Sequence, residues 1–196
     1  MAEHKPDVAA SGSAVADPSA IAGPEALGRQ ICLRLLTTEP RTRAQLADAM
    51  RKRGVPQEVA DAILDSLTDA GLIDDAAFAR AWVESRHYAR GLSRRSLSAE
   101  LRQRGVHGDD ITEAVEALAP EQEIETARQL VARKLRATRG QPAGARARRV
   151  AGLLARKGYP AALAFPLIRA ALEQEGAEGF EELDGLGADG LEAGPD

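Results

Sequence analysis

The sequence predicts an all-α protein in which three tandem three-helix repeats stack into an elongated, curved array. First, a six-residue pattern (apolar, any, any, basic, glycine, apolar) occurs as MRKRGV at 50–55, LRQRGV at 101–106 and LARKGY at 154–159. Second, its glycines lie 51 and 53 residues apart, and a recurrence of about 50 residues indicates stacked units. Third, apolar residues follow helical spacing, and no segment alternates as a strand does.

The six-residue pattern is typical of a helix end. Glycine readily adopts the left-handed conformation that follows many helices, so Gly54, Gly105 and Gly158 are each expected one residue past a helix. The apolar residues of the pattern occupy the two positions that touch in a Schellman cap. The basic residues fall in the last turn, where positive charge suits the helix dipole.

Each repeat is expected to hold three helices, and the repeats span 24–73, 74–119 and 120–175. In chain order, the expected helices cover about 24–37, 43–53, 56–70, 75–90, 94–104, 108–118, 120–138, 143–157 and 160–174.

Capping residues mark several helix starts. Thr42 and Gln45 have the spacing of a capping box, and Asp74 and Ser93 are expected to cap the fourth and fifth helices. The first helical turns are expected to include the prolines Pro56 and Pro160.

Charge is distributed unevenly along the chain. The net charge is −4, but residues 25–175 hold 25 Lys and Arg against 20 Asp and Glu, so this part is basic by +5. The flanking segments 1–23 and 176–196 are expected to be disordered tails, and the second is acidic. A basic middle points to a polyanion or an acidic partner. The acidic segment 178–196 could fold back on the basic helices and compete with polyanions.

Several classes of protein are disfavoured. Cys32 is the only cysteine, so a disulfide framework and a cysteine-rich zinc site are excluded within one chain, and Cys32 is expected in the core. The histidines have no metal-ligand spacing, and capping explains the adjacent acids Asp74 and Asp75. We therefore expect no enzyme and no cofactor.

The longest charge-free apolar stretch, 158–168, is too short for a membrane span of about 20 residues, and a cytoplasmic location is expected.

Basic residues concentrate in the middle helix of each repeat. Three such helices in a stacked array would line one stripe that suits phosphate or carboxylate recognition. The alternative is a solvated face that balances helix dipoles. The residues expected to face a filament or nucleic acid are Arg43, Arg51, Lys52, Arg94, Arg95, Arg102, Arg146, Arg148, Arg149 and Arg156.

Two other functions compete at this stage. Residues 42–75 superficially match a winged helix-turn-helix, which would make the chain a DNA-binding module or transcription regulator. Its second helix would then carry Glu58, Asp61, Asp65 and Asp69 on one face, and phosphates would repel that face. An adaptor whose partner is protein alone also stays open.

Residues 72–106, LIDDAAFARAWVESRHYARGLSRRSLSAELRQRGV, closely resemble the central repeat of the RecX regulatory proteins. The flanking repeats fit as well, so the resemblance covers about 25–175. The residues that match the family's motif are Asp74, Asp75, Phe78, Ala79, Trp82, Arg86, Gly91, Arg94, Arg95, Glu100, Leu101, Arg104 and Gly105.

The resemblance implies a function as well as a fold. RecX proteins have three tandem three-helix repeats and are not enzymes. They bind the recombinase RecA and its filament on single-stranded DNA, and they restrain filament growth, ATP hydrolysis and strand exchange in DNA repair and recombination. For this chain the resemblance implies the same partners. We further expect a monomer and no membrane association, and weak direct DNA binding stays open.

Overall fold

The structure is a computed structural model of the chain that describes residues 23–177, and these residues form helices and no strand. The prediction of an all-α fold built from tandem three-helix repeats is confirmed. Within 23–177, no helix has the length and hydropathy that a membrane span needs. The helices are α1 (Pro24–Leu36), α2 (Arg43–Arg51), α3 (Gln57–Asp69), α4 (Asp75–Arg90), α5 (Arg94–Gln103), α6 (Gly108–Glu116), α7 (Pro120–Ala137), α8 (Ala143–Arg156) and α9 (Ala161–Gln174).

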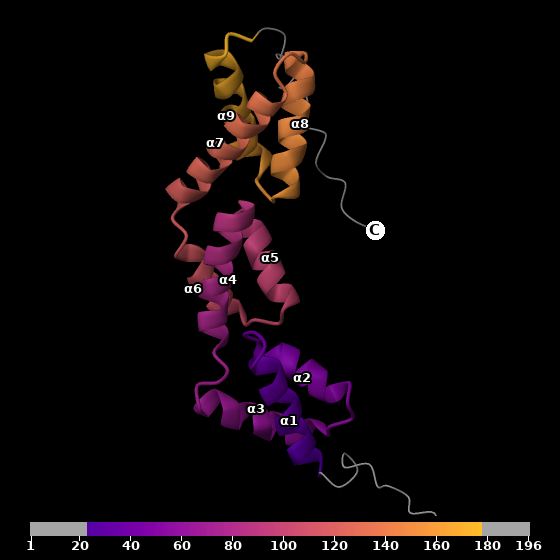
Figure 1. Cartoon of the computed structure of the whole chain (residues 1–196). Coiled ribbons are helices and arrows are strands. Elements are labelled where there is room, and N and C mark those ends of the chain that lie inside the picture. The colour runs from indigo at the N-terminus through magenta and orange to yellow at the C-terminus, as the bar shows by residue number, and fades with distance from the viewer. Residues whose placement is uncertain (1–22, 178–196) are drawn as a thin grey trace, which may run out of the picture.

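The three repeats follow one another along the long axis of an elongated molecule (Figure 1). They consist of α1–α3, α4–α6 and α7–α9, and the middle helices α2, α5 and α8 all lie toward the right of that view. Of the predicted tails, 1–23 and 176–196, residues 1–22 and 178–196 lie outside the described residues, and so does the proposed fold-back of 178–196.

The three glycine patterns end α2, α5 and α8 as predicted. Gly54, Gly105 and Gly158 have φ angles of 76°, 73° and 83°, in the left-handed region. The residue after each glycine donates its amide to the helix carbonyl five residues back, as in Tyr159 to Leu154 at 3.1 Å. This is the Schellman geometry, so the prediction of three helix ends is confirmed.

The predicted caps are present. Thr42 and Gln45 form the capping box, while Asp74 and Ser93 each accept an amide hydrogen from the first turn of their helices. The two prolines correct the prediction slightly. Pro56 and Pro160 occupy the N-cap positions of α3 and α9, one residue before the first helical turn.

Each repeat has its own hydrophobic core and does not share one continuous core with its neighbours. The first core gathers residues from 31 to 73 and includes the buried Cys32, as predicted. The second gathers residues from 79 to 118 and the third residues from 127 to 172. The three helices of a repeat enclose their own apolar side chains, which leaves largely polar contacts between repeats.

The two junctions between repeats share one design. At each junction the start of one middle helix meets the glycine end of the next middle helix. The Thr42 hydroxyl donates to the Arg104 carbonyl at 2.6 Å, and the Ser93 amide donates to the Lys157 carbonyl at 2.9 Å. The chain therefore uses its glycine ends to join repeats as well as to end helices.

An acidic side chain of the following repeat caps the middle helix at both junctions. Asp75 Oδ1 accepts from the Arg43 amide at 2.9 Å, and Glu123 Oε1 accepts from the Arg94 amide at 2.8 Å. Negative charge at a helix N-terminus is favourable, so these contacts stabilise the helix start and the junction together. Burial raises the pKa of the Asp75 carboxyl, while the Arg43 amide opposes this effect.

The glycines at the two junctions also have a steric role. A Cβ atom at Gly105 would overlap Ala44, and one at Gly158 would overlap Ser96 and Ser93. A Cβ atom at Gly54 would meet nothing within 4 Å, because Gly54 lies at neither of the two junctions. The same φ requirement therefore applies at all three glycines, but close packing applies at only two.

Candidate cationic interface

The basic residues predicted on α2 are largely neutralised within the first repeat. Arg43 pairs with Asp65 at 2.7 Å. Arg51 and Lys52 both pair with Asp48, and these two contacts lower the pKa of the Asp48 carboxyl. The α2 contribution to a cationic stripe is therefore smaller than the sequence suggests.

The predicted basic residues on α5 differ in how exposed they are. Arg94 is half-buried, and its Nε donates to the Val115 carbonyl at 3.1 Å. Arg95 and Arg102 are exposed, and they line a shallow depression between α5 and α6 that also includes Glu116. Only Arg95 and Arg102 leave their charge fully available to a partner.

On α8, the structure contradicts the prediction for Arg146. Its side chain is only 6% exposed, and Nη2 donates to the Leu135 carbonyl at 3.1 Å and to Glu175 at 2.5 Å. Arg146 therefore joins α7, α8 and the end of α9 inside the third repeat, so it is unavailable to a filament. Arg148, Arg149 and Arg156 are exposed, and Arg149 donates to Gln141.

The structure brings together a second set of basic residues that runs along the second repeat, from its junction with the first repeat to its junction with the third. We call this set the cationic cluster. Its members come from the C-terminal halves of α4 and α7 and from the residues that follow α5 and α8. They are Arg86, Arg90, Arg104, Arg133 and Lys157.

Trp82 organises one end of the cationic cluster. The guanidinium carbons of Arg86 and Arg104 lie 4.1 and 3.6 Å from the centre of the Trp82 ring, within cation–π range. The indole N–H donates to Glu100 Oε2 at 2.8 Å, and Phe78 stacks on the ring with centroids 5.7 Å apart. The Trp82 ring thus holds two like charges beside each other.

Burial and mutual repulsion both act on the cluster. Burial lowers the pKa of Arg104; Glu100 opposes this, while the charges of Arg86 and Arg90 lower the pKa further. Burial also lowers the pKa of Lys157, and the charges of Arg133 and Arg90 add to the effect. The Lys157 ammonium donates to the Arg90 carbonyl at the end of α4, where the helix dipole favours a cation.

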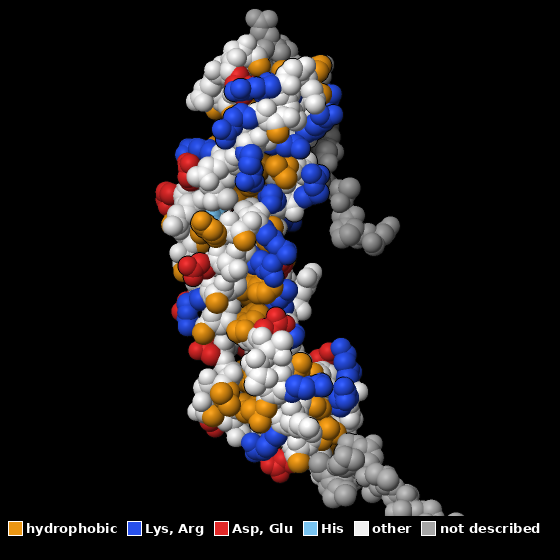
Figure 2. Space-filling model, viewed as in Figure 1, with side chains coloured by type: hydrophobic (Ala, Val, Ile, Leu, Met, Phe, Trp, Pro, Cys, Tyr) orange, Lys and Arg blue, Asp and Glu red, His pale blue; other side chains and the backbone are white. Residues whose placement is uncertain are grey.

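None of the five cluster residues forms an ion pair with a carboxylate of residues 23–177. Figure 2 shows basic side chains gathered over the middle and upper parts of the molecule, toward α5 and α8, while acidic side chains are frequent along the opposite edge. Mutually repelling cations that form no ion pair favour the binding of an anion, even with the Glu100 carboxylate near Arg104.

The sequence reasoning missed Arg90 and Arg133 and treated Arg86, Arg104 and Lys157 as motif or helix-end residues. A signal was present on α4, because Trp82, Arg86 and Arg90 follow one another at intervals of four on one helical face. No sequence pattern places Arg133 of α7 near Lys157, since that contact depends on how the third repeat folds.

Family models match all three repeats. The description "RecX, first three-helix domain" matches residues 29–67, the second three-helix domain matches 74–115, and the third matches 121–168. The chain belongs to the RecX family. It is 57% identical to the regulatory protein RecX of Thermobifida fusca over 176 residues, which cover 88% of this chain and 95% of that protein. It is also 57% identical to the RecX of Streptomyces lividans over 163 residues, covering 83% and 85% of the two chains.

Solved RecX structures share the fold. A crystal structure of a regulatory protein RecX matches with a TM-score of 0.67 and 26% identity, over 75% of this chain and 73% of that one. RecX from Lactobacillus salivarius matches with a TM-score of 0.66 over 77% and 96% of the two chains, and at 16% identity it shows the fold alone.

Proposed function

We propose that this RecX-family chain is a non-enzymatic regulator that binds RecA and its filament on single-stranded DNA, and that it restrains filament growth, ATP hydrolysis and strand exchange. The observation that supports this most is the cationic cluster, which lacks carboxylate partners among residues 23–177. A RecA filament offers DNA phosphates and protein carboxylates along a helical path, and an elongated array suits such a surface.

The proposed mechanism is occupancy. The cluster residues pair with phosphate or carboxylate groups, and the exposed Arg95, Arg102, Arg148 and Arg156 extend the contact along α5 and α8. The bound array then blocks the addition of RecA subunits and the entry of duplex DNA. No covalent chemistry is required of any residue.

RecA ATP hydrolysis and strand exchange on single-stranded DNA, measured with the protein at a substoichiometric ratio, test this function. We expect both rates to fall. Unchanged rates together with specific binding to one duplex DNA sequence would support a transcription regulator instead. Binding to a protein partner after all nucleic acid has been removed, with RecA unaffected, would support an adaptor.

A matched pair of variants tests the cationic cluster itself. Arg90→Glu with Arg133→Glu reverses one cluster charge on α4 and one on α7. Arg80→Glu with Arg128→Glu makes the same charge change on the same two helices, at residues that already pair with Glu113 and Glu125. We expect the first variant to need about tenfold more protein for half-inhibition of ATP hydrolysis and the second to need less than about twofold more. Equal losses would reject this location for the site.

A further inference from the structure

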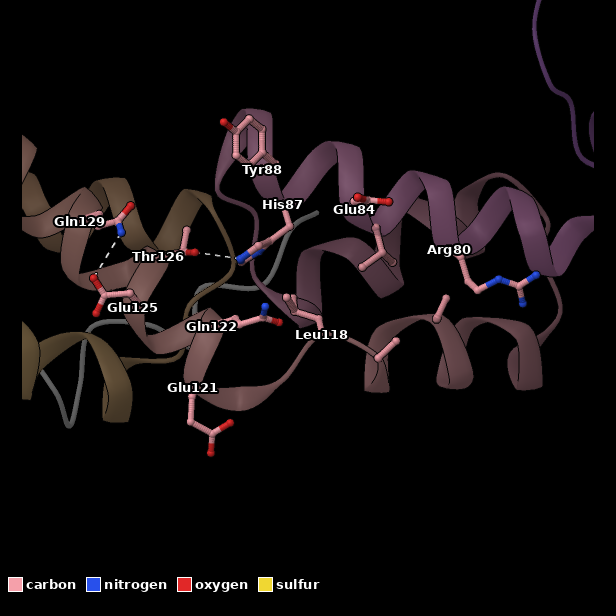
Figure 3. A pocket seen from close by; sticks show the side chains of 13 residues that line it. Arg80, Glu84, His87, Tyr88, Leu118, Glu121, Gln122, Glu125, Thr126 and Gln129 are labelled. Atoms are coloured by element: carbon pink, nitrogen blue, oxygen red, sulfur yellow. Dashed lines mark hydrogen bonds between the residues drawn. The ribbon is translucent and has the colours of Figure 1, made fainter.

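A groove lies between α4, α6 and the start of α7, and the cationic cluster does not border it. Its volume is about 760 Å³, within the range typical of ligand-binding pockets. Val83, Ala114 and Leu118 form its apolar floor, and all three belong to the core of the second repeat. Figure 3 shows Leu118 near the centre of the groove, with Arg80 toward one end, Glu125 and Gln129 toward the other, and Tyr88 above the middle.

A hydrogen-bonded histidine fixes the end of the groove where the second and third repeats meet. His87 Nδ1 lies 2.9 Å from the Leu92 carbonyl, which can only accept, so Nδ1 carries the proton. His87 Nε2 lies 2.8 Å from the Thr126 hydroxyl of α7, and in the neutral imidazole that hydroxyl donates (Figure 3). These bonds hold α4 against α7, so this end of the groove is formed before any partner binds.

The rim of the groove is acidic. Glu84, Glu121 and Glu125 line it. Arg80, the one basic residue among its lining, lies 3.5 Å from Glu113, and Arg128 lies 3.6 Å from Glu125. Negative charge repels nucleic acid, and it also repels the acidic sequence after residue 177. An occupant with positive charge is favoured instead.

Tyr88 supplies a contact that the fold itself does not use. Its side chain is 93% exposed beside the groove, although aromatic side chains are usually at least partly covered. Tyrosine combines a large apolar ring with a polar hydroxyl and is enriched where proteins meet. The lining of α4 runs from Arg80 to Tyr88, about 12 Å along the helix axis, which matches about two turns of a docked helix.

We infer that this groove docks a cationic amphipathic helix of a protein partner. The partner's apolar side chains, spaced three or four residues apart, lie over Val83 and Leu118, and its Lys or Arg residues meet Glu84, Glu121 and Glu125. The acidic groove thus gives the protein a second contact surface, opposite in charge to the cationic cluster and independent of it.

The probe for this site is a synthetic amphipathic helix of leucine, alanine and lysine, titrated into the full chain and followed by NMR at 150 mM salt. Its control is the same peptide with glutamate in place of lysine. We expect the lysine peptide to shift the amide signals of Val83, His87, Tyr88 and Leu118, and the glutamate peptide to shift none of them.

A matched pair of variants separates the groove from general charge. Glu121→Lys with Glu125→Lys reverses two rim carboxylates, while Asp61→Lys with Asp69→Lys makes the same charge change on the exposed side of α3. We expect about tenfold weaker peptide binding in the first variant and less than about twofold in the second.

Three results would overturn the inference. These are equal losses in the two variants, signal shifts confined to α5 and α8, and concentration-dependent dimerisation that moves the groove signals without peptide. The last result would make the occupant a second copy of this chain. Inhibition of RecA is read in a separate assay, so failure of the groove and failure of the proposed function are distinguishable.

Discussion

The two junctions between repeats have the same design but different strengths. Where the first and second repeats meet, the contacts are the Thr42 and Asp75 hydrogen bonds and the approach of Ala44 to Gly105. The second junction has the equivalent contacts and several more. The additional contacts are the bond from the Tyr159 hydroxyl to the Gly91 carbonyl at 3.1 Å, the Lys157 bond to Arg90, the His87 bond to Thr126, and the packing of Leu130 at Gly91.

This difference shows how the angle between two neighbouring repeats can be fixed at one junction and variable at the other. Because each repeat has its own core, only junction contacts fix the angle between neighbours. We expect repeats two and three to behave as one block, with the cationic cluster and the acidic groove on it, and the first repeat to move more freely.

Alanine at the three equivalent glycines should have the largest effects. Gly54→Ala meets open space and should lower the free energy of unfolding by about 1 kcal/mol, from its positive φ alone. Gly105→Ala and Gly158→Ala add an overlap with the preceding repeat and should lower it by about 2–4 kcal/mol. Urea unfolding of the three variants measures these values.

The relative size of the three stability losses tests whether the second junction is the stronger one. Gly158→Ala should be the most damaging, because it disturbs the junction with more contacts, and small-angle scattering should show a changed molecular length. Equal losses in all three variants would mean that φ alone matters and that the junctions are not closely packed.

Tyr159→Phe tests the extra strength of the second junction. The loss of the buried bond to the Gly91 carbonyl should lower the free energy of unfolding by about 1 kcal/mol. Burial, with a smaller effect from Glu123, also raises the pKa of the Tyr159 phenol in the folded state. Because the folded protein favours the neutral phenol, Tyr159 contributes its full share of the free energy of unfolding below the unfolded pKa of about 10. That contribution is lost as the pH rises further. Unfolding measured across this range should show a steeper decline in the wild type than in Tyr159→Phe.

Substitutions of Asp75 at the first junction should change the free energy of unfolding least. Asp75→Asn keeps an oxygen that can accept from the Arg43 amide and removes a charge whose burial is unfavourable, so stability should change by less than about 0.5 kcal/mol. Asp75→Ala removes the acceptor and should lower stability by about 1 kcal/mol. Amide exchange at Arg43 reports the cap directly, and faster exchange in Asp75→Asn than in Asp75→Ala would contradict this assignment.

Much of the fold followed from local chemistry in the sequence. Glycine at Gly54, Gly105 and Gly158 specifies a left-handed residue, and Thr42, Asp74 and Ser93 specify helix starts, so the helices could be placed from short segments. The separate cores could not be predicted, because apolar periodicity shows which face of a helix is buried but not which repeat buries it.

The candidate site was harder to predict for a similar reason. A count of basic residues treats Arg146 and Arg148 alike, although the first is buried against Leu135 and Glu175 and the second is exposed. Arg51 and Lys52 were predicted to bind a partner, but both pair with Asp48 of the same helix. The cationic cluster needs α4 to meet the ends of α5 and α8 as well as α7, and short sequence segments do not show how these helices meet.

Arginine footprinting with phenylglyoxal, read by mass spectrometry on the protein bound to RecA filaments, tests most directly whether the cationic cluster makes the contact. We expect Arg90 and Arg133 to lose reactivity on binding, while Arg80 and Arg128 on the same two helices keep theirs. Protection of Arg80 and Arg128 with Arg90 and Arg133 still reactive would contradict the assignment of this face to the filament.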